Sequence, residues 1–220
     1  MQRLVFIAVA LVAILGIGGV FILGKLAQPP APAAEETPAI ENPTPTLRAH
    51  AVLGPESAPV TVVEFSNYGC PHCRDHALKV LPLLVRDYLD PGRIRYVFRT
   101  LPFPNQPQVF AASVAATCAY DLSRERFLDY HMLLFRAAPE WLSLSGDELA
   151  DKLADYARQL GISAAELRAC LESPEAEERV RFDQALANAL GVTGTPTFFV
   201  NGEKYEGFMP YERWREILGE

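Results

Sequence analysis

Two cysteines lie close together in the segment Cys70-Pro71-His72-Cys73, a spacing suited to reversible thiol–disulfide exchange. The β-branched and apolar run at residues 60–65 predicts a buried strand that ends just before them. Apolar residues recur at helical spacing over residues 77–88, so a helix should begin at the cysteines. A helix N-terminus offers unpaired backbone N–H groups and a partial positive charge, and both stabilise a thiolate. The sequence therefore places these cysteines where a thiol becomes reactive.

The order of the two cysteines predicts their roles. Cys70, at the first exposed position, is predicted to be the nucleophile that forms a mixed disulfide, and Cys73, one turn further in, should resolve it. His72 can place a cation or an N–H donor near the Cys70 thiolate, which would stabilise the reduced form and make the disulfide a stronger oxidant. The alternative is that His72 is a solvent-exposed turn residue.

Glu64 is the acidic residue of the apolar run that precedes the cysteines. Burying its carboxylate as an ion would be costly, so its pKa should rise. A carboxyl with a raised pKa beneath a dithiol could relay the proton of Cys73. The alternative, which the alternation of the strand leaves open, is a side chain that points to solvent.

A metal site is the main chemical alternative for this segment. Cys70, Cys73 and His76 follow one helix face and could supply three ligands, but a closed zinc site needs a fourth. His72 points away from that face, and the chain has no second pair of cysteines at this spacing. Haem attachment needs a histidine directly after the second cysteine, where this chain has Arg74. We therefore predict neither a metal nor another cofactor.

The remaining cysteines, Cys118 and Cys170, suit a structural bridge. In the chain-entropy model a bridge between Cys70 and Cys73 closes too short a loop to contribute more than about 2 kcal/mol. A bridge between Cys118 and Cys170 closes a loop of about 53 residues and contributes roughly 4 kcal/mol. We therefore predict a structural Cys118–Cys170 disulfide, with two buried free thiols as the alternative.

Composition limits the classes of function. The chain has 220 residues, half of them hydrophobic, which is enough for one domain with appendages. Its net charge is −7 and it shows no basic stripe, so nucleic acid is not a predicted partner.

The N-terminal region predicts a membrane anchor. Residues 4–24 carry no charge and can span a bilayer as a helix, with a cleaved signal peptide as the competing interpretation. We assign residues 1–25 to a cytoplasmic tip and transmembrane helix, 26–47 to a Pro/Ala-rich linker, and 48–220 to a folded domain. The weak charge bias places that domain outside the cytoplasmic membrane, on a single-pass protein.

The folded part predicts an α/β domain with a helical insertion. A strand, a helix bent at Pro82 and a second strand at residues 94–98 form a unit that favours parallel pairing. Residues 107–190 predict helices alone, with capping boxes at Ser145 and Ser163 and an N-cap at Ser173. A hairpin turning at residues 201–202 and a helix over residues 211–218, starting with Pro210, complete the order.

These features together resemble one known family. Glu64-Phe65, the Cys70–Cys73 segment, the helical insert and Gly194-Thr195-Pro196-Thr197-Phe198 are similar to the DsbA family of thioredoxin-fold proteins, most of all its membrane-anchored, BdbD-like branch. The resemblance covers about residues 50–220. It implies a thioredoxin fold and a cis peptide bond between Thr195 and Pro196, packed against the cysteines. It also implies that Glu64 is the buried proton relay.

The resemblance implies an extracytoplasmic thiol:disulfide oxidoreductase that introduces disulfides into exported proteins. The Pro71-His72 pair resembles strongly oxidising members, and the backbone of Thr195 would bind an extended substrate segment by strand addition. A quinone-linked membrane oxidase of the DsbB or VKOR type would reoxidise the enzyme. One alternative is a reductase or isomerase for selected exported substrates, and another is an anchored, non-catalytic binding domain.

Overall fold

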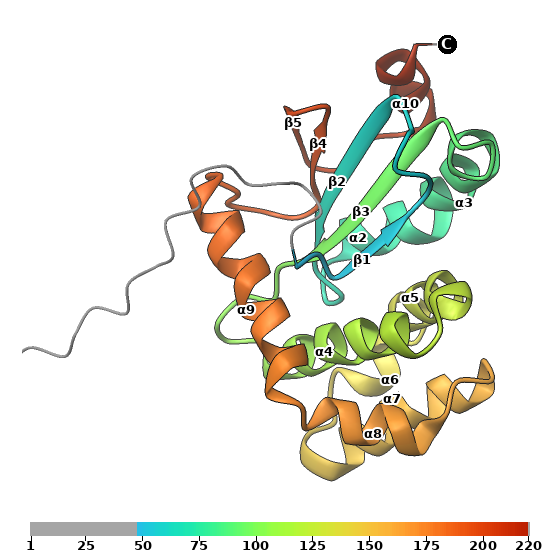
Figure 1. Cartoon of the computed structure of the whole chain (residues 1–220). Coiled ribbons are helices and arrows are strands. Elements are labelled where there is room, and N and C mark those ends of the chain that lie inside the picture. Colours follow the sequence, from blue (N-terminus) through green and yellow to red (C-terminus); the bar gives the residue numbers. More distant parts are fainter. Residues whose placement is uncertain (1–47, 220) are drawn as a thin grey trace, which may run out of the picture. The chain divides into compact units, whose positions relative to one another are not determined.

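The computed structural model describes residues 48–219. Its centre is a five-stranded sheet with the strand order β1-β3-β2-β4-β5 (Figure 1). Strand β2 pairs in parallel with β3, and the other neighbours are antiparallel. The strands are β1 (Ala51–Leu53), β2 (Val60–Ser66), β3 (Ile94–Thr100), β4 (Thr197–Val200) and β5 (Glu203–Glu206).

A broken helical segment connects β2 to β3. It comprises α2 (Pro71–Asp75), the π-helical η1 (His76–Val80), α3 (Leu81–Leu84) and the π-helical η2 (Val85–Leu89). Pro82 lies in the first turn of α3, directly after the first π-helical stretch. The interruption of the regular helix therefore falls where a residue without a backbone N–H enters it.

The segment between β3 and β4 is helical, as the sequence predicts, and lies below the sheet in Figure 1, with α9 rising beside it. Its helices are α4 (Pro107–Leu122), the 3₁₀ turn η3 (Arg124–Arg126), α5 (Phe127–Arg136), α6 (Ala138–Trp141), α7 (Gly146–Gln159), α8 (Ala164–Leu171) and α9 (Pro174–Ala189). The hairpin of β4 and β5 follows, and α10 (Tyr211–Leu218) ends the described part.

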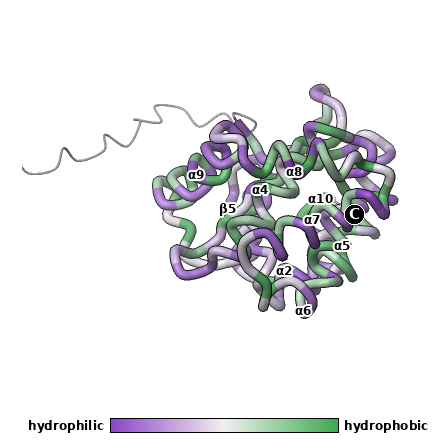
Figure 2. Tube along the Cα trace, turned by 90° about the horizontal axis from the view of Figure 1, so that it is seen from below, coloured by the Kyte–Doolittle hydropathy of each residue, from purple (hydrophilic) through white to green (hydrophobic). Residues whose placement is uncertain are grey.

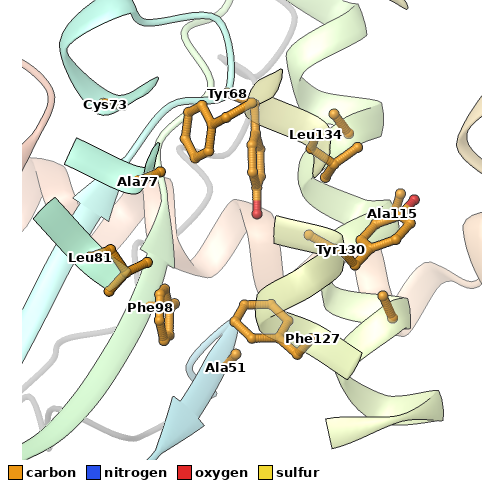
Figure 3. Packing of buried hydrophobic residues seen from close by; sticks show 14 of the residues in the cluster. Ala51, Tyr68, Cys73, Ala77, Leu81, Phe98, Ala115, Phe127, Tyr130 and Leu134 are labelled. Carbon is orange, nitrogen blue, oxygen red and sulfur yellow. The ribbon is translucent and has the colours of Figure 1, made fainter. Parts of the chain in front are cut away.

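The two faces of the sheet bury different residues because side chains alternate along β2. The larger core contains Val62 of β2 and Phe98 of β3, which packs against Phe127 of α5 (Figure 3). The smaller core lies on the other face and contains Phe65 and Leu186 of α9. Along α9 hydrophilic and hydrophobic residues alternate (Figure 2), as expected for a helix with one exposed side.

Several details differ from the sequence-based expectations. Ser163 accepts a hydrogen bond from the backbone N–H of Glu166, as expected, but the Ser145 side chain makes no such bond. Gly146, the first residue of α7, has a left-handed φ of +54°, so the backbone at the start of this helix departs from regular helical geometry. Pro210 is the N-cap of α10 and not its first residue, because its backbone is extended (ψ 160°). The short strand β1 was not predicted.

The predicted anchor at residues 4–24 and the linker at residues 26–47 lie outside the described residues. Within residues 48–219, every helix is too short or too polar to cross a bilayer.

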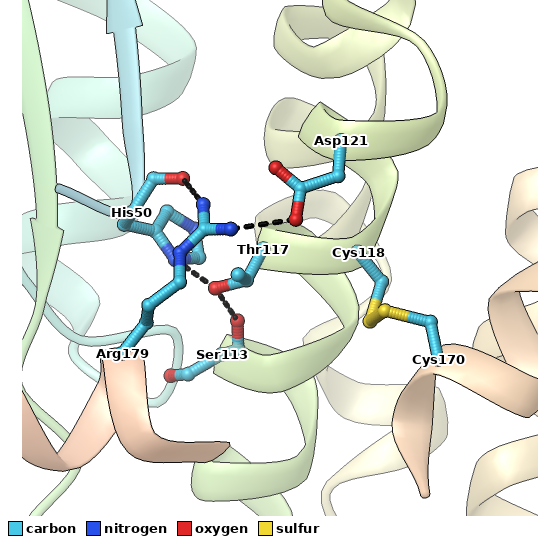
Figure 4. Close-up of a disulfide and its surroundings, with 7 residues drawn as sticks. All are labelled: His50, Ser113, Thr117, Cys118, Asp121, Cys170 and Arg179. Atoms are coloured by element: carbon cyan, nitrogen blue, oxygen red, sulfur yellow. Dashed lines mark hydrogen bonds and ion pairs between the residues drawn. A yellow bond between two sulfur atoms is a disulfide. The ribbon is translucent and has the colours of Figure 1, made fainter. Parts of the chain in front are cut away.

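The predicted disulfide is confirmed. Cys118 of α4 and Cys170 of α8, which lie 52 positions apart in the sequence, are joined (Figure 4). Arg179 of α9 lies nearby, donating to Asp121 of α4 at 2.6 Å and to the backbone oxygen of His50 at 3.0 Å. The disulfide and this arginine therefore tie three parts of the chain together around α4.

We expect replacement of both Cys118 and Cys170 by serine to lower the free energy of unfolding by about 2–5 kcal/mol. The reason is that the unfolded chain loses a cross-link that closes a long loop. Chemical denaturation of proteins that also carry Cys70→Ser and Cys73→Ser measures this effect without interference from the other thiols. Equal unfolding free energies with and without the bridge would contradict a stabilising role.

Candidate active site

The end of β2 and the start of α2 position the two thiols differently. Cys70 is the N-cap of α2 with an extended backbone, and Pro71 occupies the first turn. Cys70 is half-buried, whereas Cys73 is fully buried, and both are free thiols. The sequence-based assignment of an accessible and an inner cysteine therefore agrees with their burial.

A buried asparagine holds the loop that carries Cys70. Asn67 Oδ1 accepts from the backbone N–H of Gly69 at 2.8 Å, and its Nδ2 donates to Leu101 O and to Gln106 Oε1, both at 2.8 Å. The backbone N–H of Cys70 donates to Asn67 O at 3.0 Å. The loop is thereby fixed to the segment that follows β3.

The loop before β4 completes the surroundings of Cys70. The peptide bond between Thr195 and Pro196 is cis, which confirms the expectation from the family resemblance. The Cys70 thiol donates a hydrogen bond to Thr195 O at 3.3 Å. The fold therefore brings together residues that lie 125 positions apart in the sequence.

Hydrogen bonds favour the thiolate of Cys70 over that of Cys73. The pKa of Cys70 is lowered to about 5, chiefly because the Cys73 thiol donates to its sulfur. Backbone N–H groups of Cys73 and His72 and the side chain of Thr195 act in the same direction, against partial burial. Burial, with the neighbouring Cys70 and Glu64, raises the pKa of Cys73 far above its ordinary value.

The side chain of His72 is exposed, and its backbone N–H is one of the donors that lower the pKa of Cys70. Any non-proline residue at this N-terminal helix position would supply that backbone donor. The role of the His72 side chain as a nearby cation or donor stays a prediction.

Glu64 lies beneath the thiols, fully buried, so the alternative of a solvent-facing side chain is wrong. Desolvation raises its pKa to about 7, while the Tyr96 hydroxyl, which donates to Oε2 at 2.8 Å, acts in the opposite direction. The Ser66 hydroxyl lowers the pKa of both the Glu64 carboxyl and the Cys73 thiol, so it lies near each of them.

The sequence-based reasoning did not identify Tyr96 or Ser66 as site residues. Ser66 follows Glu64 by two positions, so strand alternation could have placed it on the same face. Tyr96 reaches the carboxyl from the neighbouring strand, which requires the register of the sheet. His76, weighed as a metal ligand, is buried with its Nε2 atom 3.0 Å from the Tyr96 hydroxyl. Residues 48–219 contain no group of three or more His, Cys, Asp or Glu side chains placed to hold a metal ion.

Comparisons with known proteins agree with this geometry. The thioredoxin family matches residues 46–220. Disulfide bond formation protein D of Bacillus subtilis is 28% identical over 179 residues, which cover 79% of this chain and 78% of that protein. A relative from Rickettsia typhi is 32% identical over 158 residues, 71% of this chain, and the match spans only 56% of its length. The crystal structure of oxidised BdbD from Bacillus subtilis superposes with a TM-score of 0.67 and 26% identity, covering 78% of this chain and 91% of that one.

We expect the Cys70 thiolate to form with a midpoint near pH 5, because hydrogen bonds from Cys73, Thr195 and the backbone stabilise it. The thiolate absorbance near 240 nm of the reduced protein, followed against pH, measures this midpoint. Cys70→Ser is the control and should remove the transition. A midpoint in the ordinary range of about 8.5 would contradict the described geometry.

Proposed function

Because the chain belongs to the DsbA and BdbD type of thiol:disulfide oxidoreductases within the thioredoxin family, we propose that its domain oxidises cysteine pairs of exported proteins outside the cytoplasm. The observation that carries this proposal is the contrast between the two thiols. Cys70 is accessible and has a pKa lowered to about 5, whereas Cys73 is buried with a raised pKa.

The exchange balances as two successive displacements. A substrate thiolate attacks Cys70 Sγ, so a substrate–Cys70 bond forms and the Cys70–Cys73 bond breaks, with Cys73 leaving as a thiolate that takes up a proton. A second substrate thiolate then attacks the first substrate sulfur and releases Cys70 as a thiolate. The substrate loses two electrons and the enzyme gains them. A thiol with a low pKa is a good leaving group, which favours the second step.

Glu64 supplies the proton that Cys73 requires. The carboxyl is buried beside the thiol, and its pKa of about 7 keeps much of it protonated near neutral pH. A buried thiolate has no solvent to stabilise it, so proton transfer from Glu64 lowers the cost of breaking the disulfide. Ser66 shares the face of β2 with Glu64, and its buried hydroxyl acts to lower the pKa of both groups.

Thr195 and Pro196 form the substrate-binding edge. The Thr195 backbone lies against Cys70 and precedes β4, so an extended substrate segment that pairs with it would place its cysteine at the Cys70 sulfur.

The uncharged residues 4–24 anchor the protein in the cytoplasmic membrane, with the domain on the outer side. This arrangement would place Cys70 and Cys73 beside a quinone-linked oxidase of the DsbB or VKOR type, which accepts the two electrons. The family resemblance supports that partner.

The direction of the reaction is tested by the redox equilibrium of Cys70 and Cys73 in glutathione buffers, with each cysteine pair followed separately by alkylation and mass spectrometry. We expect a potential near the oxidising end of the scale, about −120 mV, because the reduced form is stabilised by the low pKa of Cys70. A value near about −270 mV would indicate a reductase. Cys70→Ser should abolish oxidation of a dithiol peptide, and an unchanged rate would contradict an enzymatic role.

We expect Glu64→Gln to slow oxidation of a dithiol peptide by roughly 10²-fold at pH 6, because the variant has no proton to give to Cys73. The ionisation of the substrate thiol affects the wild-type rate and the Glu64→Gln rate equally, so its pH dependence cancels when the first rate is divided by the second. Since only the protonated carboxyl acts as an acid, this ratio should fall as the pH rises through about 7. A ratio that does not change with pH would exclude Glu64 as the proton donor.

A further inference from the structure

A chain of three buried side chains extends from the thiols into the core. Tyr96 donates its hydroxyl hydrogen to Glu64 Oε2 at 2.8 Å, and the same hydroxyl lies 3.0 Å from His76 Nε2. All three residues are fully buried. The His76 ring packs against Phe198 and Trp214, with centroid distances of 4.7 and 5.7 Å, and those two rings contact each other at 4.9 Å. The position of the imidazole is therefore fixed by packing.

The hydrogen-bond directions follow from the number of hydrogens available. An ionised Glu64 can only accept hydrogen bonds, so in that state Tyr96 gives its one hydroxyl hydrogen to Oε2 and its oxygen must accept from His76. His76 therefore carries its proton on Nε2, and its Nδ1 atom is buried without a hydrogen-bond partner. The His76 N–H and the Tyr96 O–H then both point toward the Glu64 carboxyl, which is the arrangement that stabilises an ionised Glu64.

The surroundings of Glu64 supply no positive charge to stabilise its carboxylate. Among residues 48–219, the one basic nitrogen within 4.0 Å of the carboxyl is His76 Nε2, 3.9 Å from Oε2, and this imidazole is neutral. The other titratable groups facing the two residues are Tyr68 and Cys70 of the loop between β2 and α2, Cys73 of α2 and His131 of α5. The Cys70 thiolate disfavours a charged Glu64, and His131 disfavours a charged His76. The hydrogen-bonded chain is thus the main support for a carboxylate at this position.

We infer that His76, acting through Tyr96, stabilises the carboxylate that Glu64 becomes when it gives its proton to Cys73. This inference rests on the proposed function and makes His76 a positioning residue. In the transfer, the O–H bond of Glu64 breaks and the S–H bond of Cys73 forms, while His76 stays neutral. When the proposed membrane oxidase removes two electrons and the Cys70–Cys73 disulfide forms again, Cys73 loses its proton and Glu64 takes one up. Burial lowers the pKa of His76 to about 3, in agreement with a neutral imidazole throughout.

The coupling is measured by the titration of the Glu64 carboxyl itself, followed by NMR in the reduced full chain with ¹³C-labelled glutamate. The signal is assigned by its loss in Glu64→Gln. His76→Phe removes the donor and keeps a ring packed against Phe198 and Trp214, so it should raise the midpoint of the Glu64 titration by roughly half a pH unit to one pH unit. Tyr96→Phe should raise it at least as much. The double variant should go no further than Tyr96→Phe, because His76 acts through Tyr96.

Two further variants keep the test decisive. His76→Gln restores an N–H donor and should hold the midpoint near the wild-type value, which loss of packing alone would not predict. In the Glu64→Gln background, His76→Phe should leave the rate of peptide oxidation unchanged. An unmoved midpoint in His76→Phe, or additive shifts from His76→Phe and Tyr96→Phe, would overturn the inference. Failure of the proton relay appears instead in the rate ratio for Glu64→Gln, which the titration does not use.

Discussion

The free energy of placing a negative charge in a buried site governs this active site. Cys70 reaches solvent and receives hydrogen bonds from its neighbours, so it holds a charge readily. Cys73, one helical turn further on, is buried and does not. Breaking their disulfide therefore creates one stable thiolate and one that needs a proton. The remaining features of the site follow from this difference.

The sheet supplies what the buried thiol lacks. Strand β2 lies between β3 and β4, with Glu64 paired to Phe98 on one side and Phe198 on the other. Burial among aromatic neighbours raises the pKa of the carboxyl to about 7, the range that the proposed proton transfer to Cys73 requires. Tyr96 donates a hydrogen bond to the same carboxyl, and the Tyr96 hydroxyl lies 3.0 Å from His76 Nε2. In the proposal above, these two residues offset part of the cost of burying the carboxylate.

The helical insert acts on the site indirectly. Its helix α5 contributes Phe127 to the core beneath β3, and α9 covers the opposite face of the sheet. The disulfide between Cys118 and Cys170 and the contacts of Arg179 hold the insert around α4. The segment that follows β3 also fixes Asn67, and through it the loop of Cys70. The reactive cysteine is therefore positioned by parts of the chain on both sides of the insert.

The sequence by itself determined the strand, the helix start and the reactive pair, because these depend on local periodicity and on spacing. It also predicted the structural disulfide between Cys118 and Cys170, since loop length bears on it directly. The cis bond at Pro196 and the burial of Glu64, which strand alternation left open, came from the family resemblance. Tertiary structure alone decided that the Tyr96 hydroxyl meets the carboxyl and that His76 lies behind that hydroxyl. The physical reason is that periodicity assigns a residue to a face, whereas its partners depend on strand register and on packing between distant segments.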